Sequence, residues 1–441
     1  MKIVQAVGWY FPESWGGTEV YVAGLCRRLR AAGQEVLVAA PDPAHAVERT
    51  YEHDGVPVFR YPIPAAPTRD EVQGRVRVRG AERFHRWLAD QRPDVVHAHT
   101  FVTGLGLHEL QAARAAGARV VATTHSASLG WICQRGTMMQ WGRWPCDGVC
   151  RPARCAACAL EARGVPRPVA SVLGAVPPGL GRGARRLPGR LGTALGMSDL
   201  IARNQRMQAE MLATVDRFVL LTGGALEAVA ANGAPRAKLA LNRLGLSHGK
   251  VVAKPGPDER PTGCPITVGY LGRYDAIKGV HDLARAAASL PPALGLRVEF
   301  RGPVRSAAER TVRDELRAIA GHHPRVTFAD AVPAPEVPGV LAGWDVLCCP
   351  SVCAEGGPTV AIEAHAAGTP VIGTRIGGLA ELVADGVNGA LVPPADWRGL
   401  AALLRALGHD GAATIDGWRR RLPAARTMDE IAAEHLSVYA S

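Results

Sequence analysis

The chain has 441 residues, more than one ordinary hydrophobic core holds, so its length predicts two domains. Hydrophobic residues at 47% and charged residues at 21% are typical of a soluble globular protein, and no run of about eighteen apolar residues occurs, so no membrane-spanning helix is expected. The net charge is +11, but only five of the 51 cationic residues are lysine. This arginine bias indicates a GC-rich genome more than nucleic-acid binding, although the charge suits an anionic substrate or membrane surface.

Residues 1–245 alternate short β-branched runs with helical patterns, which predicts a doubly wound parallel sheet covered by helices. The first run begins as a strand and not as a signal peptide, because no basic region precedes a long apolar run, so cytoplasmic residence is expected. The predicted strands are 2–7, 34–41, 94–99, 118–125 and 217–222, and the predicted helices are 18–33 and 107–117. Residues 129–200 break the alternation and carry five of the ten cysteines, which indicates an insertion.

Residues 246–261 are rich in Gly and Pro and are predicted to form a linker. A second α/β domain follows over residues 262–415, and residues 416–441 are predicted to form a helix that packs back across the domains. The predicted strands of the second domain are 266–273, 296–302, 326–330, 344–351, 370–374 and 389–394, and its predicted helices include 281–290 and 308–321. Ligands bind at the carboxyl ends of such strands, so two facing domains are expected to hold one ligand in the cleft between them.

Glu355 and Glu363 stand eight positions apart, the first beside a Gly-Gly-Pro turn and the second inside an apolar helix. The helix is predicted to start at Gly357-Pro358, because proline suits a first helical position. The N–H groups of Thr359 and Val360 would then lack helical partners and attract phosphate. One carboxylate could accept hydrogen bonds from a ribose and the other from a second hydroxylated ring. Two ordinary surface glutamates on a solvated helix are the alternative.

Cations and glycines stand at two other strand ends. Arg273 and Lys278 follow the first strand of the second domain, where a guanidinium fork and an ammonium suit the oxygens of a diphosphate. Gly16 and Gly17 stand in the first strand–helix loop of the first domain, where glycine lets a ligand approach the backbone closely. A surface pair of cations and a simple tight turn are the respective alternatives. The fold would bring the cations, the carboxylates and the helix start to one site.

Three histidines lie at or just past strand ends of the first domain. We interpret His97 as a satisfied core residue, whereas His125 follows two threonines at the start of the insertion and is predicted to contact ligand. His99 lies between them. The sequence has no P-loop, no GxGxxG after a strand and no Asp-x-Asp, which disfavours the corresponding dinucleotide site and a metal-clamped diphosphate.

These features together resemble the retaining glycosyltransferases of family four, which have the GT-B fold of two doubly wound Rossmann-like domains facing across a cleft. The most specific motif in this resemblance is the Glu-x7-Glu element, whose second glutamate begins the segment EAHAAGTPVI. The other motifs are GGTEVYVAGLCRRLRAAGQEV, PDVVHAH, TTH, GYLGRYDAIKG, WDVLCCPS and GGLAELVADGVNGALV, so the resemblance runs over most of the chain.

The resemblance implies a hexosyltransferase-like enzyme that uses a nucleotide-diphosphate sugar, with UDP as the usual carrier. It implies that Glu363 holds the nucleotide ribose and that Glu355 contacts hydroxyls of the donor sugar. Arg273 and Lys278 would neutralise the diphosphate, and His125 would orient the sugar. The acceptor would carry a hydroxyl group, as in a glycan, a lipid-linked sugar or a small natural product.

The resemblance also implies a reaction without a metal cofactor or a protein nucleophile, in which the acceptor attacks the face that the leaving group departs from. A phosphate oxygen would take the acceptor's proton, and Gly17 would let the N-terminal loop close on the phosphates. One departure concerns the residues after Glu355, where the family often has an aromatic residue. Here Gly-Gly-Pro-Thr follows, and Pro358 offers no N–H.

The insertion has a cysteine pattern typical of a structural zinc site. Cys155 and Cys158 have the spacing of a zinc knuckle, and Cys146 and Cys150 add a second pair. The resemblance implies the set Cys133, Cys146, Cys155 and Cys158, with Cys150 as an extra thiol. A cluster of reduced buried thiols is the alternative. Cys348, Cys349 and Cys353 are predicted to be packing residues.

Two other functions remain as alternatives. A sugar-nucleotide epimerase of similar two-domain form would use the same nucleotide but need no acceptor. A zinc-bearing nucleic-acid-binding protein would use the positive charge, but basic and aromatic residues do not interleave near the cysteines, so we expect no nucleic-acid partner. Arginines and short apolar pieces after the insertion's cysteines suggest peripheral contact with the inner face of the cell membrane as a further alternative.

Overall fold

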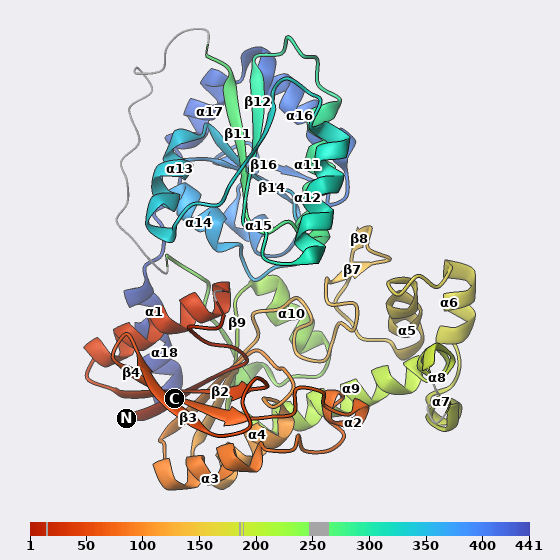
Figure 1. The fold of residues 1–441 in the computed structure, drawn as a ribbon, viewed down its shortest axis with the longest axis vertical. Coiled ribbons are helices and arrows are strands. Elements are labelled where there is room, and N and C mark those ends of the chain that lie inside the picture. The colour runs from red at the N-terminus through yellow and green to blue at the C-terminus, as the bar shows by residue number, and fades with distance from the viewer. Residues whose placement is uncertain (15, 185–186, 188, 247–263) are drawn as a thin grey trace. The chain divides into compact units, whose positions relative to one another are not determined.

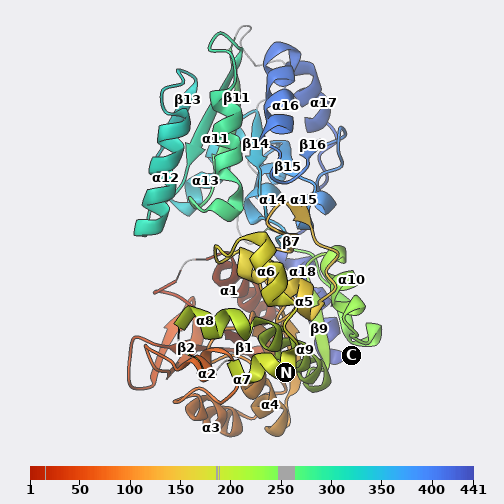
Figure 2. The same ribbon diagram turned by 90° about the vertical axis from the view of Figure 1, so that its right-hand side faces the viewer.

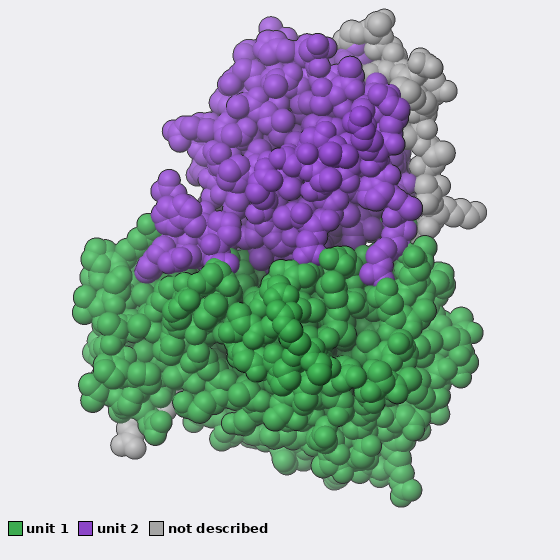
Figure 3. Space-filling view, turned by 180° about the vertical axis from the view of Figure 1, so that it is seen from behind, with its two compact units in different colours: residues 1–138, 147–247, 427–441 green, residues 139–146, 248–426 purple. Residues whose placement is uncertain are grey.

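The computed structural model describes residues 1–14, 16–184, 187, 189–246 and 264–441, shown from two sides in Figure 1 and Figure 2. The chain forms two compact units, which Figure 3 colours separately. Unit 1 comprises residues 1–138, 147–247 and 427–441, and unit 2 comprises residues 139–146 and 248–426. Each unit has its own parallel sheet, as the sequence predicts. The predicted linker, 246–261, lies outside the described residues from residue 247 on.

Unit 1 is built on an eight-stranded sheet with the order β10-β9-β6-β5-β1-β2-β4-β3. The strands are β1 (Lys2–Val7), β2 (Glu35–Asp42), β3 (Arg49–His53), β4 (Val56–Pro62), β5 (Val95–His99), β6 (Arg119–Thr123), β9 (Arg217–Leu220) and β10 (Leu239–Leu241). All neighbouring strands pair in parallel except β3, which pairs antiparallel with β4 at one edge. From β1 the chain continues to β2, β3 and β4 on one side of the sheet, and from β5 it continues to β6, β9 and β10 on the other. The strand order therefore reverses between the neighbouring strands β1 and β5.

The helices of unit 1 include α1, which follows β1, and α18, which comes from the far end of the sequence. They are α1 (Gly17–Ala31), α2 (Arg69–Val72), α3 (Glu82–Gln91), α4 (Leu107–Ala115), α5 (Pro152–Glu161), α6 (Arg167–Gly174), α7 (Pro178–Ala184), α8 (Gly189–Leu195), α9 (Met197–Thr214), α10 (Gly223–Ala231) and α18 (Met428–Ala440). Helix α18 packs on α1, and its buried residues Met428, Ile431 and Tyr439 belong to the same core as β1 and β2. The predicted C-terminal helix, 416–441, is therefore two elements, because residues 416–419 finish a helix of unit 2.

The predicted insertion consists of short elements. Helices α5 to α8 belong to unit 1, and α5 and α6 lie side by side in Figure 2. The two-residue strands β7 (Met139–Gln140) and β8 (Trp144–Pro145) pair as an antiparallel hairpin that belongs to unit 2. No helix in the described part of the chain has both the length and the apolar character needed to cross a bilayer.

Unit 2 is built on a six-stranded parallel sheet with the order β13-β12-β11-β14-β15-β16. Its strands are β11 (Ile266–Leu271), β12 (Leu296–Arg301), β13 (Val326–Ala329), β14 (Val346–Cys349), β15 (Val371–Thr374) and β16 (Gly389–Val392). Its helices are α11 (Val280–Ala288), α12 (Ala307–Ala320), α13 (Val337–Gly343), α14 (Thr359–Ala366), α15 (Gly377–Leu382), α16 (Trp397–Asp410) and α17 (Ala412–Arg419).

Successive side chains along the strands of unit 2 point to opposite faces of the sheet, and apolar side chains form a core on each face. In β14, Val346 and Cys348 point into the core formed with α11 and α16, whereas Leu347 and Cys349 point into the core formed with α13 and α14. A strand that is apolar on both faces is expected where helices cover both sides. Cys348 and Cys349 are therefore packing residues, as predicted, and Cys353 is also buried.

Candidate active site

The strand order of unit 2 reverses between β11 and β14. From β11 the chain continues to β12 and β13 on one side, and from β14 it continues to β15 and β16 on the other. The loops that leave the carboxyl ends of β11 and β14 diverge at this point, and such a crevice is where open α/β sheets bind ligands. The β11 loop, residues 272–279, carries the predicted cations, and the β14 loop, residues 350–358, carries the first predicted carboxylate.

These two loops bring Lys278 and Glu355 into contact. The Lys278 ammonium forms an ion pair with Glu355 Oε2, and both side chains are about three-quarters or more buried, with 25% and 19% of their surface exposed. The other oxygen, Oε1, accepts a hydrogen bond of 2.6 Å from the Ser351 hydroxyl. Both oxygens of Glu355 are thus fixed in direction. Ser351 was not singled out from the sequence, since a serine after a strand carries no signal of its own.

The contact follows from a close backbone fit between the loops. The Val352 N–H donates to the Ile277 carbonyl oxygen at 2.9 Å. Gly279 ends the β11 loop with φ +69°, and a Cβ there would lie 1.8 Å from the Pro350 carbonyl oxygen. Only glycine satisfies both conditions without a shift of the backbone. The residue after Lys278 thereby sets how near its ammonium comes to the β14 loop.

Helix α14 begins at Thr359, with Pro358 at the N-cap. The sequence placed proline at the first helical position, so the helix starts one residue later than predicted. The N–H groups of Thr359 and Val360 have no acceptor within the helix and stand at its positive end. Behind this turn, the start of α15 packs so tightly that a Cβ on Gly378 would lie 2.6 Å from Gly357 Cα.

The remaining predicted residues of unit 2 lie nearby in the chain but make no direct contact with the ion pair. Arg273 is 55% exposed in the β11 loop, and its nearest acid is Asp275 at 3.7 Å. Glu363 is half-buried on α14 and forms no ion pair or side-chain hydrogen bond with any described residue. Burial raises the pKa of the Glu363 carboxyl. A partly buried carboxylate without a partner is suited to accept hydrogen bonds from a ligand.

Unit 1 places its predicted glycines at the start of α1. Gly16 is the N-cap, and Gly17 is the first helical residue. A Cβ on Gly17 would meet no atom within 4 Å, so packing does not require glycine there. A Cβ on Gly16 would lie 2.4 Å from Glu19 Oε2. The Glu19 side chain is held in this position because its Oε1 accepts a hydrogen bond of 2.7 Å from the Ser14 hydroxyl. The open space at Gly17 leaves ligand approach as a reason for its glycine.

The three histidines at the carboxyl ends of β5 and β6 form one hydrogen-bonded cluster. His97 bonds the Tyr439 hydroxyl at 2.7 Å and Thr123 Oγ1 at 2.8 Å, and it is fully buried. His99 bonds His125 at 3.2 Å through its Nδ1 atom and the Gln5 amide oxygen at 2.6 Å through Nε2. The prediction that His97 is a satisfied core residue is confirmed.

Burial keeps these imidazoles neutral. It lowers the pKa of His97 and His99 well below the usual value, with the neighbouring histidines adding to the effect, and it lowers the pKa of His125 to about 4. Neutral imidazoles can both donate and accept hydrogen bonds at physiological pH. His125 is the member of the cluster that retains some exposure, so it is the one suited to meet a sugar hydroxyl.

The predicted metal site of the insertion rests on four cysteines. Cys133, Cys155 and Cys158 belong to unit 1, and Cys146 belongs to unit 2. Within the residues that the structure describes, which include all four, no group of three or more His, Cys, Asp or Glu side chains is arranged to hold a metal ion. The structure therefore gives the zinc prediction no support. The neighbouring Cys150, together with the Arg151 N–H that donates to Cys155 Sγ at 3.3 Å, lowers the pKa of the Cys155 thiol.

Two family models match the chain. Residues 15–177 match the model described as Glycosyltransferase Family 4, and residues 265–410 match the model described as Glycosyl transferases group 1. The first spans the glycine loop and the histidine cluster, and the second spans the loops of Lys278 and Glu355. The chain belongs to glycosyltransferase family 4. It is a glycosyltransferase, as its resemblance predicts.

Curated relatives agree with this family-4 assignment. A D-inositol 3-phosphate glycosyltransferase from Arthrobacter sp. (strain FB24) is 27% identical over 426 residues, which cover 91% of this chain and 84% of that protein. A 2-deoxystreptamine N-acetyl-D-glucosaminyltransferase from Streptomyces fradiae is 30% identical over 246 residues, which cover 52% of this chain and 56% of that protein.

Solved structures show that this family-4 glycosyltransferase has the GT-B fold. Sucrose-phosphate synthase from Thermosynechococcus elongatus superposes with a TM-score of 0.66 at 20% identity, covering 100% of this chain and 98% of that one. Anabaena HepE in complex with UDP and glucose superposes with a TM-score of 0.63 at 15% identity, covering 100% of both chains. The predicted fold class is confirmed.

Proposed function

We propose that this glycosyltransferase moves a sugar, with retention of its anomeric configuration, from a UDP-sugar to a hydroxyl group of an acceptor. The observation that carries the proposal is the Lys278–Glu355 ion pair at the point where the strand order of unit 2 reverses. A partly buried cation beside the start of a helix suits a diphosphate, and the adjacent carboxylate suits sugar hydroxyls. Among the structural neighbours, HepE binds UDP and glucose.

In unit 2, each predicted residue is assigned one partner on the donor. Lys278 and Arg273 neutralise the diphosphate, assisted by the N–H groups of Thr359 and Val360. Glu355 accepts hydrogen bonds from the donor sugar, and Glu363 accepts them from the ribose. Burial without a partner disfavours the ionised form of Glu363, and hydrogen bonds from ribose hydroxyls would favour it.

In unit 1, we assign His125 to the donor sugar and the Gly16–Gly17 loop to the phosphates. His125 is suited to this role because burial keeps its imidazole neutral, and its Nε2 atom is held by His99 at 3.2 Å. The other ring nitrogen is then available to a sugar hydroxyl. Gly17 would let the backbone at the start of α1 approach a phosphate oxygen.

The chemistry is stabilisation of a leaving diphosphate. As the bond between the anomeric carbon and the phosphate oxygen breaks, negative charge grows on the diphosphate and is met by Lys278 and the helix terminus. The freed phosphate oxygen takes the proton of the attacking acceptor hydroxyl, so no protein base or nucleophile is required. Removing one preorganised contact of this kind typically costs about 2.7–4 kcal/mol, or roughly 10²–10³ in rate. The sequence has no Asp-x-Asp, and the proposal uses no metal ion.

The test compares Lys278→Ala and Glu355→Ala with Lys2→Ala. Lys2 provides a matched control, because it forms a comparable ion pair with Glu35 at 3.2 Å far from the carboxyl ends of the strands. We expect each of the first two variants to lose at least about a hundredfold in transfer from UDP-sugar while its circular dichroism and melting temperature stay near those of the parent.

Product analysis separates the proposal from its rivals. Proton NMR of the product should show the same anomeric configuration as the donor, and activity should survive EDTA. An isomerised donor without a glycosylated acceptor would identify an epimerase instead. Full activity in Lys278→Ala or Glu355→Ala would contradict the roles assigned above.

We also propose that the insertion of unit 1 touches an anionic membrane surface. Residues 162–198 contain six arginines and no Asp or Glu. Within this stretch, Val172, Leu180 and Leu191 are 72%, 71% and 60% exposed. Exposed apolar side chains in an arginine-rich stretch suit a bilayer of acidic lipids. The protein should sediment with phosphatidylglycerol vesicles but not with phosphatidylcholine vesicles, and Leu180→Asp should release it; equal recovery from both would exclude the contact.

A further inference from the structure

Two cysteines of the insertion meet where the chain enters helix α5 in unit 1. The N-cap of α5 is Arg151, so Cys150 stands at N′, one residue before the cap, and Cys155 stands at N4. Side chains at N′ and N4 often pack against each other at the start of a helix. Each thiol also shifts the pKa of the other, raising that of Cys150 and lowering that of Cys155. The geometry of helix entry therefore brings the two thiols together.

The backbone of Cys150 is held by two other helices of unit 1. Its N–H donates to Oδ1 of Asn232, the C-cap of α10, at 2.8 Å. Its carbonyl oxygen accepts a hydrogen bond of 2.9 Å from the side-chain amide of Gln205 on α9. The residue is buried, with 7% of its surface exposed. Cys150 therefore leaves its place beside Cys155 only if these two hydrogen bonds break.

Cys155 is the accessible member of the pair. It retains partial exposure in the first turns of α5, and its Sγ accepts the Arg151 N–H at 3.3 Å. The Arg154 guanidinium, which pairs with Asp147, also acts on this sulfur. A helix N-terminus and a neighbouring cation favour the thiolate, which is the form that attacks a disulfide. Cys155 is thus placed to react first, and the buried Cys150 is placed to react second.

Two other cysteines of unit 1 lie near the pair but are held by different groups. Cys133 raises the pKa of Cys150 more weakly than the N4 thiol does, and its Sγ accepts the Met138 N–H at 3.4 Å. Cys158 lies one turn further along α5. There Arg135 Nη1 donates to its carbonyl oxygen at 3.2 Å and lies 3.9 Å from its Sγ. Cys133 and Cys158 are therefore the neighbouring thiols with which the pair is compared.

From this geometry we infer that Cys150 and Cys155 form a thiol modification site, which a disulfide of a small thiol oxidises to an intramolecular disulfide. The Cys155 thiolate attacks one sulfur of the small disulfide, which forms a mixed disulfide and releases a thiolate that takes a proton from water. Cys150 then attacks Cys155 Sγ, and the second small thiol leaves with the proton that Cys150 loses. Two electrons pass from the pair to the small disulfide. The inference does not depend on the proposed function.

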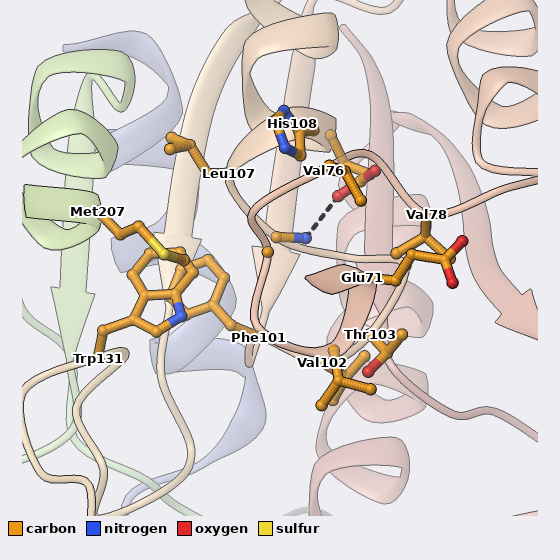
Figure 4. A pocket seen from close by; sticks show the side chains of 15 residues that line it. Glu71, Val76, Val78, Phe101, Val102, Thr103, Leu107, His108, Trp131 and Met207 are labelled. Carbon is orange, nitrogen blue, oxygen red and sulfur yellow. Dashed lines mark hydrogen bonds between the residues drawn. The ribbon is translucent and has the colours of Figure 1, made fainter. Parts of the chain in front are cut away.

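The pair lies outside the pocket of unit 1. The pocket has a volume of about 240 Å³, and no cysteine is among the fifteen described residues that line it, which include Phe101, Trp131 and Met207 (Figure 4). Helix α9 joins the two places, because it carries both Met207 and Gln205, which bonds the Cys150 backbone. Oxidation therefore adds no group to the pocket wall, and a bridge over residues 150–155 fastens the start of α5 to α9.

The test treats the reduced protein with hydroxyethyl disulfide and maps the product by mass spectrometry. After alkylation, trypsin gives peptides 144–154 and 155–163, because it does not cut before Pro152. In the parent these peptides should be joined, with fragmentation assigning the bridge to Cys150 and Cys155, and dithiothreitol should separate them. A bridge that uses Cys146 or Cys158, or a Cys155 that stays unmodified, would overturn the inference.

Serine variants distinguish the two roles. Cys155→Ser should abolish the bridge, whereas Cys150→Ser should stop at a mixed disulfide on Cys155, since the second attacking thiol is gone. Cys158→Ser is the matched control in the same helix and should form the bridge as the parent does. A mixed disulfide on Cys150 in the Cys155→Ser variant, at the rate seen for Cys155, would contradict the order of attack.

Hydrogen exchange and metal analysis provide independent readouts. Amides of α5 should exchange about tenfold more slowly in the oxidised parent, because the bridge restricts local opening, and Cys150→Ser should show no slowing. Slowing in that variant would assign the effect to another thiol and refute the inference. Release of one zinc ion per chain on oxidation would show that these thiols hold a metal, and it would also refute the inference.

Discussion

Mild acid should destabilise unit 1 through its buried histidines. His97 and His99 are completely buried, and their pKa values lie well below the unfolded value of about 6.5. Below pH 6.5 the unfolded chain binds protons that the folded chain does not, so stability is lost as the pH falls. At pH 5 the cost is about 1.4 kcal/mol for each of about 1.5 pH units, or about 2 kcal/mol for His125, whose pKa of about 4 lies below that pH, and His97 and His99 add to the loss in the same direction.

That loss is a large part of the free energy of unfolding, which is typically about 5–15 kcal/mol for a folded domain. The groups that face these imidazoles are His125 from the loop after β6, His435 and Tyr439 from α18, and Tyr21 from α1. Burial raises the pKa of Tyr439 far above neutral, so the hydroxyl does not titrate in this range and offers no anion to stabilise an imidazolium. The described carboxyl groups with lowered pKa values protonate only at lower pH.

The assay is urea denaturation at pH 7.5 and pH 5.0, followed by near-ultraviolet signals of the tryptophans in unit 1. The midpoint should fall at pH 5.0, and the double variant His97→Gln/His99→Gln should show a smaller fall. His365 of unit 2 is also buried with a pKa of about 4, so part of the fall should survive in the double variant. Proton NMR of the parent provides an independent readout. Equal midpoints at both pH values, or a His97 resonance titrating near pH 6.5, would refute the reasoning.

Three further predictions concern unit 2. Because burial raises the pKa of Glu363, UDP affinity should fall as the pH drops through that raised value, beyond the fall that protonation of UDP itself causes. Glu363→Gln should bind UDP more weakly and should lose this extra fall, as calorimetry of parent and variant between pH 7.5 and 5 would show. Gly378→Ala should lower stability by about 1–3 kcal/mol, since its Cβ would overlap Gly357, whereas Gly339→Ala, with open space at its Cβ, should not, as thermal melts would show. Ser351→Ala should reduce kcat by about tenfold through a less directed Glu355, with little change in melting temperature, and an unchanged kcat would show that the hydrogen bond does not position Glu355.

The sequence predicts well where a local pattern determines structure. The alternation of strands and helices, the start of α14 to within one residue and the burial of His97 all follow from residue type and spacing. Lys278 was recognisable because lysine is rare in this chain. These are features that the nearest ten or so residues decide.

Contacts between distant segments were not predictable in the same way. The ion pair of Lys278 with Glu355 joins residues 77 positions apart and depends on the fit of Gly279 against Pro350. The cysteine spacing suggested a metal site, to which the described residues give no support. Spacing states which thiols can be close, whereas the turns between them decide which thiols are close.

The last helix of the sequence completes the first unit. Residues of α18 fill the core beside α1, and Tyr439 bonds both His97 and Gln5. During synthesis, the ribosome must therefore release the whole of the second unit before the first can acquire its final core. A proteolytic cut after residue 426 would detach α18 from the chain, so it would weaken the core of the first unit while leaving the second unit intact.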